Sequence, residues 1–357
     1  MIRRFLILIT VAASLYGCNQ PGTTGSVIMH DDFAVIDSTG ATNNFYDNVE
    51  TYKLPVGIIT VEGEIANPGA ADLSSLPLRS VIVKEALPAA DGGNRFTGAF
   101  RYDGYSLLDI LNDRVLQKAN AEEFEPIIDL FVEVENSSGE KVVFSWGELY
   151  YPNNLHRIII ATRVARIVPS KTNELWDLPT GSKIVAGNDL LTSRNISDPV
   201  RVTVRSYPKS FETVKGLSPM YSNSFSVYGT DDNILDEFSS LHSGMARLTY
   251  HTIFYGRGKG IHSTTPFRGI MLKDLLLPYY PLSENALKRG LLCVVAADGY
   301  RMTVTWSELF NRNDQQEILL IEDVNGEDGG RFRFFPACDF FSDRAIKSVA
   351  SVYYTER

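Results

Sequence analysis

The side chains best suited to binding an anion lie in a short glycine-rich segment, residues 255–262. Glycines separate Arg257, Lys259 and His262 in this segment. Glycine lets a backbone approach a ligand closely, and arginine, lysine and histidine can hold a phosphate or a carboxylate. The alternative is that the glycines form the solvated tip of a β-hairpin. The segment is therefore a candidate anion site, and we assign no catalytic residue to it.

Two further segments place a tryptophan beside an acid, as a ligand-stacking site would. They read Ser145-Trp146-Gly147-Glu148 and Thr305-Trp306-Ser307-Glu308. A serine or threonine three residues before a glutamate is also a capping box, which closes the N-terminus of a helix. We therefore expect each glutamate to cap a short helix and each tryptophan to pack beneath it. Asp189 with Arg194 and Asp339 with Arg344 are expected to form ion pairs or turns.

The N-terminus predicts export and lipidation. Arg3 and Arg4 precede an apolar run that is too short to span a bilayer. The run ends in L-Y-G-C at Cys18, which resembles the lipobox cut by bacterial lipoprotein signal peptidase. Residues 1–17 are then a signal peptide, Cys18 carries the lipid (palmitate or a similar acyl chain), and residues 18–49 form a flexible tether. An ordinary secretory signal or an uncleaved anchor is the alternative. The expected location is the bacterial cell envelope, at the outer membrane or the periplasmic face of the inner membrane.

Composition and motif spacing argue against a nucleic-acid partner and against the common metal-binding and catalytic motifs. The chain of 357 residues is 44% hydrophobic and 22% charged, which is typical of a globular protein. Its formal charge of −9 becomes −11 once Arg3 and Arg4 are removed, so no nucleic-acid partner is expected. Apart from Cys18 only Cys293 and Cys338 remain, and whether they form a disulfide is left open. The spacings typical of metal sites, nucleophile elbows and phosphate-binding loops are missing from the sequence, and we expect no metal ligand.

The second half of the chain repeats the first. Residues 72–76 recur at 237–241, the pattern G-x-x-L-x-D-x-L recurs at Gly104 and Gly269, and F-S-W-G-E-L-Y at 144–150 recurs as V-T-W-S-E-L-F at 304–310. The matches occur in one order with a gradually falling offset. We therefore divide the chain into repeat 1 at 50–206, a linker at 207–221 and repeat 2 at 222–357.

Short strands dominate both repeats. Alternation and turn residues predict strands at 57–65, 200–204, 225–228 and 348–354, hairpins at 132–144 and 291–304, and a short helix packed through residues 107–115. The fold class we expect is α+β, with two tandem strand-rich domains and short connecting helices.

The order of these pieces resembles the molybdopterin-binding domain of the sulfite oxidase family. The shared marks are Asn67-Pro68, D-L-x-x-L-P from Asp72, G-x-x-L-x-D-x-L, the glycine-turn hairpin, W-x-E-L, and a C-terminal R-x-x-K. The resemblance implies a sulfite-oxidase-like fold for each repeat. It also implies that Arg344 and Lys347 lie near a pterin phosphate, together with the segment 255–262.

The resemblance departs from the family at the metal. Family enzymes hold molybdenum through a cysteine thiolate, a soft ligand that other side chains do not readily replace. Neither corresponding stretch, 80–87 or 246–254, contains cysteine. We expect no bound cofactor, with molybdopterin as the alternative.

The sequence thus favours a lipid-anchored, non-catalytic protein with degenerate molybdopterin-binding-type domains. It would bind an anionic small molecule or an envelope protein, with Arg257, Lys259, His262, Arg344 and Lys347 as ligand-binding candidates. The alternatives are a molybdopterin-dependent oxidoreductase without the cysteine ligand and a pure interaction scaffold.

Overall fold

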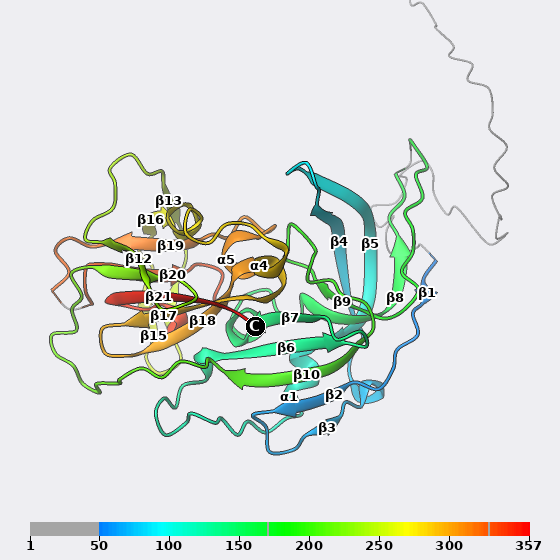
Figure 1. Ribbon diagram of the computed structural model, residues 1–357, viewed down its shortest axis with the longest axis horizontal. Helices are drawn as coiled ribbons and strands as arrows, with labels where there is room; N and C mark the ends of the chain where they lie inside the picture. Colours follow the sequence, from blue (N-terminus) through cyan, green and yellow to red (C-terminus); the bar gives the residue numbers. More distant parts are fainter. Residues whose placement is uncertain (1–49, 170, 328) are drawn as a thin grey trace, which may run out of the picture. The chain divides into compact units, whose positions relative to one another are not determined.

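Four β-sheets, two from each half of the sequence, make up most of the computed structural model (Figure 1). The structure describes residues 50–169, 171–327 and 329–357. The predicted signal peptide, the predicted lipidation site Cys18 and the predicted tether therefore lie outside the described residues. Among the described residues, every helix is too short or too polar to span a bilayer.

The α+β expectation with two tandem domains is wrong. Strands hold 41% of the described residues and helices 12%, and the small sheets form a ring that resembles a four-bladed β-propeller. The reason lies in the helices, since even α1 and α4 span only six residues each. A helix of under two turns can close a connection but cannot cover a sheet as a separate layer. The apolar faces of the sheets are buried against other sheets instead.

The first half forms two five-stranded sheets. One has the order β1-β8-β5-β4, with β9 also paired to β8. Its strands are β1 (Tyr52–Lys53), β4 (Arg79–Pro88), β5 (Asn94–Ser106), β8 (Ile158–Arg166) and β9 (Lys183–Ala186). The other has the order β3-β2-β10-β6-β7. Its strands are β2 (Thr60–Gly63), β3 (Gly69–Ala70), β6 (Leu130–Asn136), β7 (Lys141–Ser145) and β10 (Pro199–Ser206).

The second half forms two more sheets and a separate hairpin. The order β12-β11-β21-β17-β18 joins β11 (Phe225–Tyr228), β12 (Ile234–Phe238), β17 (Gly290–Ala296), β18 (Arg301–Thr305) and β21 (Val349–Glu356). The order β13-β16-β19-β20 joins β13 (Arg247–Tyr250), β16 (Phe267–Met271), β19 (Ile318–Glu322) and β20 (Phe332–Pro336). The hairpin pairs β14 (Phe254–Gly256) with β15 (Gly260–Ser263).

One sheet of each half follows the same plan. In the first half β2 runs parallel to β10, which pairs antiparallel with β6, and β6 with β7. In the second half β11, β21, β17 and β18 pair in the same senses. Both predicted hairpins are confirmed, and their turns place Gly139 and Gly299 at φ +84° and +81°, where glycine is favoured.

Short helices connect the strands. They are η1 (Leu73–Ser75), α1 (Leu107–Asn112), η2 (Ile127–Asp129), α2 (Trp146–Tyr150), α3 (Leu272–Leu276), α4 (Glu284–Arg289), α5 (Trp306–Phe310) and η3 (Ser342–Arg344). The predicted helix at 107–115 ends at Asn112, and the prediction that Val115 packs was wrong, because its side chain is 63% exposed.

One apolar core runs through both halves. Its buried members include Val132 and Trp146 from the first half and Val294 and Trp306 from the second. A second, smaller cluster lies on the sheet of β4, β5 and β8, beneath Trp176 and Leu178. Because the main core is shared, neither half buries its apolar faces alone.

Candidate functional site

The structure separates Arg344 from the other predicted basic residues. Arg257 lies at the tip of the β14–β15 hairpin and forms an ion pair with Asp343, with Nε at 2.9 Å and Nη2 at 2.6 Å from Oδ1. Lys259, His262 and Lys347 are exposed. The Arg344 side chain is fully buried, so it cannot share a ligand at the surface with the others.

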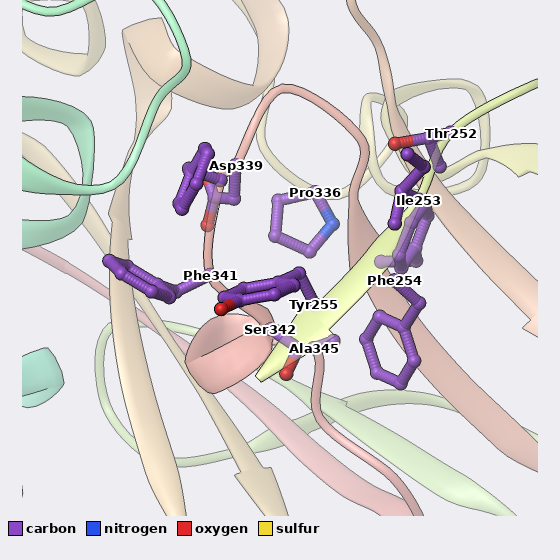
Figure 2. A pocket seen from close by; sticks show the side chains of 11 residues that line it. Thr252, Ile253, Phe254, Tyr255, Pro336, Asp339, Phe341, Ser342 and Ala345 are labelled. Carbon is purple, nitrogen blue, oxygen red and sulfur yellow. The ribbon is translucent and has the colours of Figure 1, made fainter. Parts of the chain in front are cut away.

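Beside this hairpin lies a small cavity, shown in Figure 2. Tyr255, Asp339 and Phe341 line it, and its volume is about 10 Å³. A space of this size holds about one water molecule. A pterin-sized ligand does not fit there.

The donor set does not fit molybdenum held by a thiolate. The stretch 80–87 is part of β4 and the stretch 246–254 includes β13, and neither holds a cysteine. Cys293 and Cys338 are both free and buried, and burial raises the pKa of the Cys338 thiol to about 12. Within the described residues, no group of three or more histidine, cysteine or acidic side chains is placed to hold a metal ion.

The predicted ion pairs are confirmed, and they form one buried network. Arg194 donates to Asp189 at 2.6 Å and to Glu148 at 2.9 Å. In the second half, Arg344 donates to Asp339 at 2.7 Å and to Glu308 at 2.5 Å. Each arginine thus bridges the aspartate five residues before it and the glutamate of a short helix.

Hydrogen bonds between the capping residues of α2 and α5 connect the two parts of the network, the one around Arg194 and the one around Arg344. Ser145 forms the expected capping box with Glu148 at the start of α2. At the start of α5 only half of the expected box is present, since Thr305 accepts from the Glu308 N–H while the Glu308 carboxylate turns away. The Ser145 hydroxyl donates to Glu308 at 2.6 Å, and the Thr305 hydroxyl donates to Glu148 at 3.1 Å. These residues therefore join the two halves of the chain.

The network holds more negative than positive charge. Two guanidinium groups face four carboxylates, namely Glu148, Asp189, Glu308 and Asp339. Burial raises the pKa of Glu148, and the nearby charge of Glu308 raises it further. Burial likewise raises the pKa values of Asp189 and Asp339. Because each group already has partners inside the protein, the arrangement stabilises the fold and presents no free group to a substrate.

A larger cleft lies along β4, with a volume of about 610 Å³. This volume is in the range that accepts a drug-sized ligand. The lining comes from both halves of the chain and consists of Ile82, Val83, Lys84, Ala99, Asn154, Arg157, Ile167, Gly187, Asn188, Asn313 and Asp314.

Arg157 is held in place within this cleft. Its Nη2 donates to the Gly187 carbonyl at 3.1 Å and its Nε to the Asn188 side chain at 3.3 Å. Burial lowers the pKa of Arg157, although arginine remains charged. Its hydrogen-bond partners carry no charge, and the nearby Asp314 carboxylate acts on the guanidinium without a direct ion pair.

The cleft has an excess of positive charge. Lys84 is exposed and forms no ion pair with another described residue. Asp314 forms an ion pair with Arg312, whose Nε donates to Oδ1 at 2.9 Å and whose Nη2 donates to Oδ2 at 2.5 Å. The apolar wall of Ile82, Ala99 and Ile167 beside two cations suits an amphipathic anion.

Sequence reasoning missed this cleft. Its two cations come from β4 and from the loop before β8, 73 positions apart in a chain without a matching motif. Sequence reasoning predicted no strand at β4, where the structure buries Val81 and Val83 and exposes Ile82 and Lys84. No protein-family model matches this chain, and no curated protein matches it.

Proposed function

We propose that this chain is a lipid-anchored binding protein of the bacterial cell envelope that holds an amphipathic anion in the β4 cleft without catalysis. The observation that carries the proposal is the pair of cations, Lys84 and Arg157, in a cleft of ligand size with an apolar wall. In a chain of net charge −9, such a local excess of positive charge selects anions.

The anchor rests on the sequence alone. The lipobox-like segment at Cys18 supports acylation, and Cys18→Ala is expected to abolish incorporation of radiolabelled palmitate in growing cells. Continued labelling of the variant would remove the anchor from the proposal without affecting the cleft.

The cleft is tested with phenylbutyrate, a soluble amphipathic carboxylate, and with its neutral amide. The protein is reconstituted in lipid nanodiscs, and ligand-observed NMR measures binding against empty nanodiscs. We expect the carboxylate to bind more tightly than the amide. Arg157→Gln is expected to weaken binding of the carboxylate by roughly tenfold, because a charge-assisted hydrogen bond is lost.

The matched variants separate the cleft from the predicted basic segment. Lys84→Gln is expected to weaken binding by about threefold, as for an exposed ion pair. Lys259→Gln, which removes a charge at the β14–β15 hairpin, is expected to leave binding unchanged. Equal affinity for the amide, or loss of binding only with Lys259→Gln, would refute the proposed site.

A further inference from the structure

The strand β4 is the edge of its sheet. It pairs with β5 on one side, and no strand of the described residues pairs with it on the other. Edge strands present unpaired N–H and C=O groups and can therefore pair with another chain. The register of β4 with β5 shifts between Glu85 and Ala86, at the end where the cleft begins.

One point on this edge already pairs with a chain segment. The Thr192 N–H donates to the Ala86 carbonyl at 2.8 Å, and the Ala86 N–H donates to the Thr192 hydroxyl at 3.2 Å. The backbone groups of Ala86 thus point away from β5. Because these directions alternate along a strand, the groups of Lys84 and Ile82 point the same way. Both residues line the cleft.

We propose that the occupant of the cleft is an extended acidic peptide segment of a partner protein, which adds to β4 as a further strand. This inference rests on the proposed function and names its ligand. Strand addition draws affinity from main-chain hydrogen bonds and specificity from alternate side chains. Here the outward groups of Ile82 and Lys84 supply the hydrogen bonds, and Lys84 with Arg157 supplies the preference for acidic side chains.

A second copy of this chain fits the edge less well. Antiparallel pairing of two β4 strands around residue 84 places Lys84 opposite its own counterpart, and like charges opposite each other destabilise a sheet. An acidic segment avoids this lysine–lysine contact, because it places carboxylates opposite Lys84.

The probe is a blocked six-residue peptide that alternates valine and glutamate, titrated into the full-length protein in nanodiscs by calorimetry. Two N-methylated forms carry the methyl groups on alternate backbone nitrogens. In strand addition only one set of nitrogens faces β4, so one form should lose at least about tenfold in affinity while the other binds normally. A valine–lysine peptide serves as the charge control and is expected not to bind.

Each outcome decides between the inference and its alternatives. Equal binding of both N-methylated forms would show that side chains alone hold the peptide, and strand addition would be wrong. Binding of phenylbutyrate without binding of any peptide would overturn the inference and leave the proposed function standing. Failure of both ligands would overturn both. A Lys84→Glu variant that binds the valine–lysine peptide instead would support the assignment of charge selection to this edge.

Discussion

Removing Arg344 tests whether the buried network stabilises the fold. The substitution Arg344→Met keeps an apolar stem of similar length but leaves Asp339 and Glu308 without their guanidinium partner. The three hydrogen bonds that the substitution removes are 2.5, 2.7 and 2.8 Å long, and the Arg344 side chain is fully buried. Breaking a buried ion pair in this way costs about 3–5 kcal/mol.

Urea unfolding followed by tryptophan fluorescence measures this loss, since Trp146 and Trp306 begin the two helices of the network. The matched control is Arg257→Met, whose ion pair with Asp343 lies at the surface. It is expected to cost at most about 1 kcal/mol. Equal stability of the two variants would refute the view that the network stabilises the fold.

A second substitution sharpens the test. Adding Glu308→Gln to Arg344→Met removes one of the two unpaired charges, so part of the lost stability should return. Strictly additive destabilisation would mean that the two side chains act independently. Because Ser145 and Thr305 link the halves, both halves are also expected to unfold in a single transition.

Three further outcomes are expected. Gly147→Ala should lose about 1–3 kcal/mol of stability, because a Cβ would lie 2.1 Å from Arg344 Nη1. The raised pKa of Glu148 favours its protonated form in the folded state, so its contribution is full at low pH and lost as the pH rises above its ordinary value of 4.5. The stability of wild type relative to Glu148→Gln, measured by urea unfolding, should therefore fall as the pH rises above 4.5. Cys293 and Cys338 should resist Ellman's reagent in the native protein and react in urea, because burial raises the pKa of both thiols.

Controls accompany these measurements. Gly57→Ala should be neutral, since nothing lies within 4 Å of its added Cβ. A stability difference for Glu148→Gln that increases with pH would show that Arg194 dominates the titration of this carboxylate. Rapid labelling of either thiol in the native protein would contradict its burial.

Local sequence patterns predicted those elements whose hydrogen bonds join residues close together in the sequence. The turn glycines at 139 and 299 and the alternation around them predicted two hairpins that the structure contains. The capping box at Ser145 was predicted completely, because its hydrogen bonds join residues three apart. The predicted box at Thr305 is only half present. The Glu308 carboxylate instead contacts Ser145 and Arg344, which lie 163 and 36 positions away in the sequence.

The sequence by itself predicted the two hairpins, the capping box at Ser145, the Asp–Arg pairs and the repeated order of these pieces, because each local element depends on spacing within a short segment. Only the tertiary structure decided that four sheets share one core and that Arg344 points inward. It also decided that Lys84 and Arg157 meet in one cleft. These outcomes depend on contacts between segments far apart in the chain, and such contacts cannot be predicted from the residues that adjoin each position in the sequence.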